Sequence, residues 1–304
     1  MKTRNAITYR SLGGAAFAGA VLFTISSAQA QNLFVSSFAT GHVYEYTPGG
    51  VQSTFASGLN YPDGVAFNAN GDLFVGNTAL NAGDTGSITE FSRAGTQTTF
   101  YNGVDAVGLA FDNAGDLFEA DYSSGNIYKY TPAGVQSLFA SGFNIPTALA
   151  FNSAGDLFVG GGGGNNGYIS ELLPNGTAGS FSVTGLNFPA GLAFNSAGTL
   201  FQTDNGSGRI YEYTPGGTQS IFVTGLSAPN GMAFDGSGNL FVGESYSNGT
   251  DGRIVEITPG GTVNPFATGI VEPDGLAFQP VPEPSVLGLM VAGAAGFLAW
   301  RRKQ

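Results

Sequence analysis

The chain contains no cysteine among its 304 residues. Disulfide bonds, thiolate chemistry and lipid attachment through an N-terminal cysteine are therefore excluded. A folded domain of this chain must be stabilised by its apolar core alone. Phenylalanine supplies that core, because the chain has 25 phenylalanines and each one buries roughly 150–250 Å².

Positive charge is also scarce. Between residues 31 and 280 only Arg93, Lys129, Arg209 and Arg253 carry a fixed positive charge. Every acidic residue except Glu283 lies in the same segment, so its formal charge is 4 minus 20, or −16. Nucleic acid is excluded as a partner, because phosphate binding needs a basic surface. An acidic surface is compatible with cations and favours solubility.

His42 is the only histidine. This disfavours lyases and hydrolases that use a histidine base. Val43 is expected to begin a strand, which places His42 in the loop before it. The glycine run at 160–164 is not a phosphate loop, because no Lys-Ser or Lys-Thr follows it. We therefore assign no catalytic residue from the sequence.

Residues 1–30 have the pattern of a secretion signal. Three basic residues come first: Lys2, Arg4 and Arg10. An apolar stretch follows, and Ala28 and Ala30 then provide a small-x-small cleavage site. A membrane anchor is the alternative, but the apolar stretch is short and rich in glycine and alanine. We expect the mature protein to begin at Gln31.

The C-terminal segment, residues 281–304, has three parts. The motif Pro282-Glu283-Pro284 comes first, fifteen uncharged residues follow at 286–300, and a basic cluster at 301–303 closes the chain. As a helix, the uncharged stretch is roughly 22 Å long, which is short for a hydrocarbon core about 30 Å thick. The segment resembles the PEP-CTERM sorting signal. The resemblance implies an exosortase as processing partner, transient inner-membrane anchoring through this transmembrane tail, and release to the cell surface or an extracellular matrix.

Residues 31–280 are built from a repeat. Leucine-phenylalanine pairs begin at Leu33, Leu73, Leu117, Leu157, Leu200 and Leu240. Their spacing of 40, 44, 40, 43 and 40 residues is typical of solenoids and propellers. One repeat, 189–222, contains four short alternating or apolar runs separated by glycine-rich turns. Four antiparallel strands per about 40 residues make one propeller blade.

The ends of the repeat region predict how the ring closes. The mature chain starts at a second strand, Leu33-Phe34, and ends with an unpaired first strand at 273–278. Pairing these halves completes one blade and leaves no long open edge. Phenylalanines at equivalent positions of the first, second and fourth strands are expected to pack between blades. The sequence thus predicts an all-β fold: a six-bladed β-propeller with a split closing blade.

The repeat region contains the motifs P-x-G-[LVM]-A-F, then G-[DNT]-L-F, then R-I-Y-E-Y. They resemble NHL-type and gluconolactonase (senescence-marker-like) propellers over the whole region. The resemblance implies the fold and leaves the activity open, since propellers carry many functions. The signatures of WD and kelch propellers are absent.

Polar residues at the entry of the innermost strands form a candidate site. The middle residues of P-x-G and its counterparts are Asp63, Val107, Thr147, Ala190, Asn230 and Asp274. Asn230, Asp274 and Asp63 belong to consecutive blades, and their oxygens suit Ca²⁺ or another divalent cation. The gluconolactonase resemblance implies a metal at such positions. Ordinary turn chemistry of Asp and Asn before Gly is the alternative.

A second set of mainly polar residues ends the second strands: Ser37, Asn77, Asp121, Gly161, Asp204 and Glu244. Asp204 precedes Arg209 and Glu244 precedes Arg253, which suggests loop-bracing ion pairs or turn caps. An outer shell to the channel site is the functional alternative.

These observations predict a non-catalytic, exported propeller that binds a ligand at the cell surface or in exopolysaccharide. A divalent-metal-dependent lactonase-type hydrolase is the alternative, with the metal activating a water or polarising a lactone carbonyl. A scaffold that joins other surface proteins is a third. Membrane contact is expected only through the C-terminal tail before its cleavage.

Overall fold

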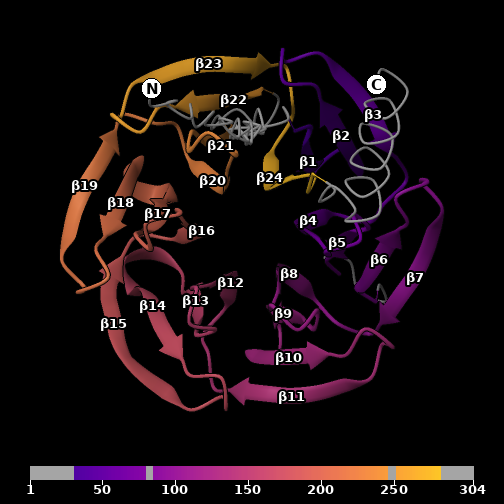
Figure 1. Cartoon of the computed structure of the whole chain (residues 1–304), viewed down its shortest axis with the longest axis horizontal. Coiled ribbons are helices and arrows are strands. Elements are labelled where there is room, and N and C mark those ends of the chain that lie inside the picture. The colour runs from indigo at the N-terminus through magenta and orange to yellow at the C-terminus, as the bar shows by residue number, and fades with distance from the viewer. Residues whose placement is uncertain (1–30, 80–84, 246–250, 282–304) are drawn as a thin grey trace, which may run out of the picture.

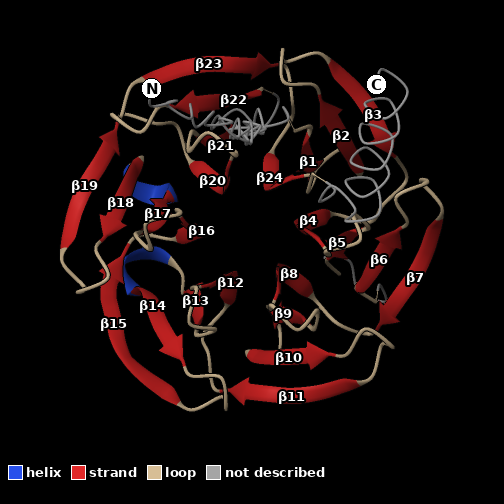
Figure 2. Ribbon diagram, in the orientation of Figure 1, coloured by secondary structure: helices blue, strands red, loops and turns tan. Residues whose placement is uncertain are grey.

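The computed structural model describes residues 31–79, 85–245 and 251–281. Within these residues, 24 strands form six four-stranded antiparallel sheets. Figure 1 shows the sheets arranged as blades around a common axis. Figure 2 shows that strands dominate, with only two short helical turns in the described part. The predicted six-bladed propeller is confirmed.

The elements of the first three blades follow the repeat. Blade 1 contains β24 (Pro273–Phe278), β1 (Leu33–Ser37), β2 (His42–Tyr46) and β3 (Gln52–Ala56). Blade 2 contains β4 (Pro62–Phe67), β5 (Leu73–Asn77), β6 (Ser87–Phe91) and β7 (Gln97–Asn102). Blade 3 contains β8 (Ala106–Phe111), β9 (Leu117–Asp121), β10 (Asn126–Tyr130) and β11 (Gln136–Ser141).

The other three blades differ mainly in two 3-10 turns, η1 (Gly164–Asn166) and η2 (Asn205–Ser207). Blade 4 contains β12 (Pro146–Phe151), β13 (Leu157–Gly161), β14 (Gly167–Leu172) and β15 (Ala178–Leu186). Blade 5 contains β16 (Pro189–Phe194), β17 (Leu200–Asp204), β18 (Arg209–Tyr213) and β19 (Gln219–Thr224). Blade 6 contains β20 (Pro229–Phe234), β21 (Leu240–Ser245), β22 (Gly252–Ile257) and β23 (Val263–Thr268).

The ring closes as the sequence predicts. Strand β24 pairs antiparallel with β1, with Leu33 opposite Phe278 and Val35 opposite Leu276. Just outside the strands, the Gln279 main-chain N–H donates to the Asn32 carbonyl over 3.0 Å. The first and last parts of the domain therefore share one sheet, and the closing blade has no unpaired internal edge.

The core lies between blades and is aromatic. In each blade the second-strand phenylalanine contacts the fourth-strand ring of its own blade and the first-strand ring of the next. The ring centroids are 4.9–5.2 Å apart in edge-to-face geometry. This arrangement is the favoured one for aromatic pairs. The expected interblade packing of phenylalanines is confirmed.

The residue before the innermost strand has left-handed backbone in five blades: Tyr61, Ile145, Phe188, Ala228 and Glu272. Each of these residues precedes a proline. Its carbonyl oxygen accepts a hydrogen bond from a main-chain N–H at the end of the second strand of the same blade. The donor is the residue just after that strand in four blades and the last residue of β21 in blade 6. In blade 5, for example, the Asn205 N–H donates to the Phe188 carbonyl over 3.0 Å. A non-glycine residue in this region is strained by about 1–2 kcal/mol. The strain recurs around the ring, so it belongs to the scaffold that positions the channel entry.

The start of β2 differs from the prediction. Strand β2 begins at His42 itself, so His42 is not a loop residue as predicted; the backbone of His42 pairs with Ser37. The signal segment 1–30 and the sorting segment from residue 282 onward lie outside the described residues. Within the described part of the chain, no helix has the length and apolar character needed to cross a bilayer.

Candidate functional site

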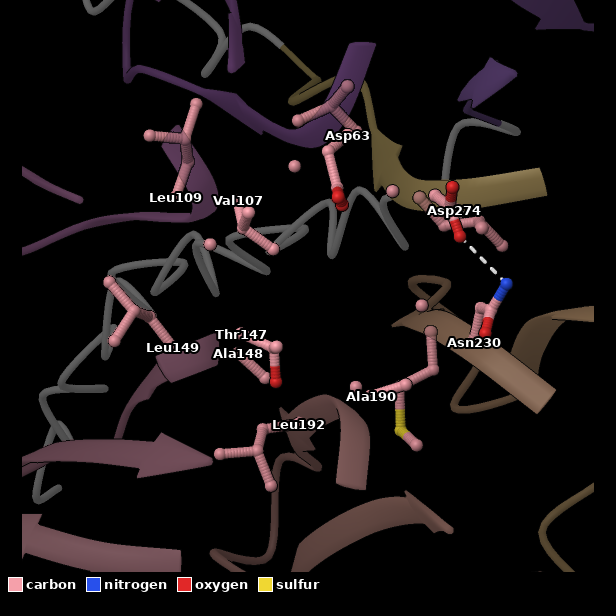
Figure 3. Close-up of a pocket in the computed structure, with 18 of the residues that line it drawn as sticks. Asp63, Val107, Leu109, Thr147, Ala148, Leu149, Ala190, Leu192, Asn230 and Asp274 are labelled. Carbon is pink, nitrogen blue, oxygen red and sulfur yellow. Dashed lines mark hydrogen bonds between the residues drawn. The ribbon is translucent and has the colours of Figure 1, made fainter. Parts of the chain in front are cut away.

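One cavity of about 200 Å³ lies at the entry of the central channel. All six first-strand entry residues line it: Asp63, Val107, Thr147, Ala190, Asn230 and Asp274. Figure 3 shows the carboxyl groups of Asp63 and Asp274 and the amide of Asn230 on one side of this cavity. The structure therefore brings the three sequence-predicted site residues into one place, on β4, β24 and β20.

Close backbone approach explains why these side chains meet. A Cβ atom on Gly231 would lie 2.0 Å from the Asp274 carbonyl oxygen, and one on Gly275 would lie 2.4 Å from the Asp63 carbonyl oxygen. Only glycine fits at such distances. The P-x-G motif thus lets adjacent innermost strands nearly touch, and the residue before each glycine faces the same opening.

Asn230 is held by several hydrogen bonds. Its Nδ2 donates to Asp274 Oδ1 over 2.7 Å and to Ser245 Oγ over 3.1 Å. Its Oδ1 accepts a hydrogen bond of 2.6 Å from Asn205 Nδ2. Asn205 and Ser245 were missed by sequence reasoning, because Asn205 follows β17 and Ser245 ends β21, and both reach Asn230 only in three dimensions.

The two carboxyl groups share an unfavourable environment for charge. Burial raises the pKa of Asp63 well above its usual range, and the Asp274 and Asp105 carboxylates raise it further. Burial also raises the pKa of Asp274 to about 7, with a smaller contribution from Glu272. None of the described residues lining the cavity is Lys, Arg or His. The pair therefore lacks a cationic side chain that would stabilise its ionised form.

The other side of the cavity is mixed. Val107, Leu109, Leu149 and Leu192 line it together with Thr147, whose hydroxyl group lies on this side (Figure 3). Phe188 also lines the cavity and is 38 % exposed. The mouth is thus a small site with its carboxyl groups gathered on one wall and mainly apolar residues, with the Thr147 hydroxyl, on the other.

The donor set fits a divalent cation in part. Two carboxylates with raised pKa values would regain their charged form beside a cation, and carboxylate and amide oxygens are ligands that Ca²⁺ accepts. Asn230, however, turns its amide N–H toward Asp274, so its side chain would have to rotate to offer oxygen. Among the residues described, no three His, Cys, Asp or Glu side chains gather into a metal-binding group. Any cation here would rest on Asp63 and Asp274, with water or main-chain oxygens completing its shell.

The residues that end the second strands act as braces. Asp121 accepts the Asp105 N–H over 3.0 Å, Asp204 accepts the Asn187 N–H over 2.8 Å, and Glu244 accepts the Ser227 N–H over 2.6 Å. Each acceptor is buried and fixes the connection that enters its own blade. Arg253 pairs with Glu244. Asp204 caps η2 through the Ser207 N–H, and in the described part of the chain no ion pair joins it to Arg209.

His42 does not belong to the channel site. Its ring stacks on Tyr44 with centroids 5.5 Å apart, and it is not among the residues that line the cavity. The Nδ1 atom of His42 is buried without a hydrogen-bond partner among the described residues.

The sorting tail and the fold have known counterparts. Residues 280–303 match the PEP-CTERM protein-sorting motif, which implies processing by an exosortase and export with a membrane-anchored C-terminal tail. No curated protein matches the chain by the sequence search.

Solved structures match the propeller. One, assigned as a gluconolactonase, has a TM-score of 0.59 and 17% identity, and the match covers 73% of this chain and 81% of that one. Another is a catalytically inactive virginiamycin B lyase from Staphylococcus aureus with quinupristin, with a TM-score of 0.61 and 14% identity; the match covers 84% of this chain and 94% of that one. At these identities the likeness is one of fold.

Proposed function

We propose that this chain is an exported propeller that acts as a non-catalytic binding module at the cell surface or in the extracellular matrix. Export is supported by the PEP-CTERM motif. The binding role rests on the channel mouth, a cavity of about 200 Å³ with Asp63, Asn230 and Asp274 gathered on one wall. Exopolysaccharide and neighbouring surface proteins are the partners that such a location makes available.

The main support for this proposal is the pair of carboxyl groups at the channel mouth. Asp63 and Asp274 both have raised pKa values, and no Lys, Arg or His side chain lines the described cavity. A bound divalent cation would compensate this charge and stabilise the folded state by mass action. We infer that the mouth takes up Ca²⁺ or a similar cation, either for stability or as part of ligand binding.

A divalent-metal-dependent lactonase is the second candidate. It is favoured by the placement of Asn230, Asp274 and Asp63 at one channel entry and by the fold shared with the gluconolactonase. A cation there would supply Lewis-acid polarisation of a lactone carbonyl. The residues of this chain would contribute the two carboxylates that hold it, and a water molecule from the channel would be the second reactant of the hydrolysis.

Thermal unfolding at pH 8 tests the cation site. Ca²⁺ at 100 times its Kd should raise the melting temperature by roughly 5–10 °C, since the linkage is worth about 2.7 kcal/mol in a domain of this size. Asp274→Asn should abolish the rise. Asp156→Asn is the matched control: Asp156 lies in a turn at the other end of the blade, and Asn239 occupies the equivalent position in blade 6.

Two results would overturn the proposal: a wild-type melting temperature that chelator and Ca²⁺ leave unchanged, or a shift that survives in Asp274→Asn. A lactone-hydrolysis screen of the Ca²⁺-loaded protein then separates the two candidates. Turnover that disappears in Asp274→Asn supports the lactonase, and binding without turnover supports the module.

A further inference from the structure

One position on the third strand separates blade 3 from the other blades. The residue opposite the second-strand phenylalanine is Glu45, Glu90, Glu171, Glu212 or Glu256 in five blades and Lys129 in blade 3. Cross-strand partners of this kind lie on the same face of the sheet. Each glutamate therefore stands beside the aromatic core at the place where blade 3 has an ammonium group.

Lys129 shows what this place can hold. Its Nζ lies 5.3 Å from the centroid of the Phe118 ring, within the range of a cation–π contact. The same Nζ lies 2.7 Å from Asp116 and 3.8 Å from Asp112, both in the turn between β8 and β9. An aromatic ring and the acidic turn of one blade thus hold a lysine side chain within this protein.

Three other blades carry an open crevice at the equivalent place. The crevices lie between blades 2 and 3, between blades 4 and 5, and between blades 6 and 1, with volumes of about 150, 440 and 170 Å³. Each is lined by the three clustered phenylalanines of its interface, by a Thr-Pro turn, and by the third-strand glutamate of Glu90, Glu171 or Glu256. The repeat thus builds one kind of crevice three times on one face.

Charge favours a cation in these crevices, most clearly in the two smaller ones. Among the described residues that line the largest, Glu171 is the one carboxylate, and its Oε2 also accepts the main-chain N–H groups of Ser180 and Phe181. Glu256 shares its crevice with Asp235, and Glu90 shares its crevice with Asp72. Burial and the neighbouring Asp72 carboxylate raise the pKa of Glu90. None of the described residues lining the three crevices is Lys, Arg or His, although the side chain of Arg93 packs close to Gly71 near the first of them.

We propose that these three interblade crevices bind the ammonium groups of lysine side chains on a basic partner protein. Each would receive a lysine as blade 3 holds Lys129, with the alkyl stem along the phenylalanines and the ammonium on the glutamate. The crevices lie at the turns that join first and second strands. These turns are at the opposite end of each antiparallel blade from the channel entry. The surface is therefore separate from the channel mouth, and three equivalent sites on one face permit multivalent attachment.

The test is an NMR titration of the purified protein with Nα-acetyl-lysine amide, using Nα-acetyl-norleucine amide as a neutral match. Thr131, Thr214 and Thr47 each line one crevice and report on it separately. The lysine compound should give saturable shifts at all three, weakened by salt, and the norleucine compound should give none. Glu256→Lys should place an internal ammonium in its own crevice and abolish only the Thr47 shift. Blade 3 has Lys129 at the position equivalent to Glu256, so we expect the fold to accept a lysine there.

Asp274→Asn should leave all three shifts intact, so failure of this proposal and failure of the channel-mouth proposal are distinguishable. Equal shifts from the two compounds would overturn the proposal, because binding would then be apolar only. A Thr47 shift that Glu256→Lys leaves unchanged would overturn it too.

Discussion

At the residue scale, the third position of the second strand shows how single substitutions alter a repeat. Four blades place a buried valine there: Val35, Val75, Val159 and Val242. Blade 3 has Glu119 and blade 5 has Gln202, and both are fully buried. Burial, with the Asp121 carboxylate as a further cause, raises the pKa of Glu119 to about 9. Tyr130 donates a hydrogen bond of 3.2 Å to one oxygen, and the other has no partner among the described residues.

Glu119 predicts a pH-dependent stability. An acid whose folded pKa is raised stabilises the fold fully below its unfolded pKa of about 4.3, and that stability is lost as pH rises toward 9. Glu119→Gln should remove this dependence of the unfolding free energy on pH. It should stabilise the protein at pH 9 by at least about 1.4 kcal/mol, the equivalent of one pKa unit. Chemical unfolding at pH 5 and pH 9 measures the difference.

The reverse substitution is the control. Gln202→Glu places an acid at the equivalent site of blade 5, where the native amide donates to the Thr203 carbonyl over 2.6 Å. It should introduce a slope like that of Glu119. Parallel pH profiles for wild type and Glu119→Gln would show that Glu119 is ionised in the folded protein and would contradict the account.

At the element scale, strand β24 closes the ring of blades by pairing with β1. Leu276 is buried opposite Val35, so it joins the end of the domain to its beginning. Leu276→Ala should destabilise the fold by about 2–5 kcal/mol through lost burial and a residual cavity. Val263→Ala on the outer strand β23, where the side chain is 38 % exposed, should cost less than about 0.5 kcal/mol. The denaturant midpoints of the two variants measure this difference. If the two midpoints were nearly equal, closure of the ring would contribute little to stability.

The elements also show how far the sequence predicts the fold. The Leu33-Phe34 start and the 273–278 end predict the shared blade, because a repeat with a missing strand must find it elsewhere. The left-handed residues before the prolines, such as Ile145, are not predictable, since a β-branched residue avoids that conformation unless the fold imposes it. The partners of Asn230 and the burial of Glu119 depend on neighbouring elements, so residue type alone does not reveal them.

At the scale of the whole molecule, the two terminal signals predict a processed product. The secreted protein should begin near Gln31 and end close to Pro284, because we expect the signal segment and the PEP-CTERM tail to be cleaved off. Intact-mass measurement on extracellular material checks both ends at once. A mass that retained residues 286–304 would contradict release by tail cleavage.

The central claim is that the channel mouth holds a cation through Asp63 and Asp274. Calorimetric titration of Ca²⁺ at pH 6, in two buffers of different ionisation enthalpy, tests it most directly. Because both carboxyl groups have raised pKa values, binding should displace protons, and the observed heat should depend on the buffer. We expect one Ca²⁺ to bind per chain with release of protons, and both the binding and the proton release to be lost in Asp274→Asn. Absent binding, or binding whose heat is the same in both buffers, would contradict it.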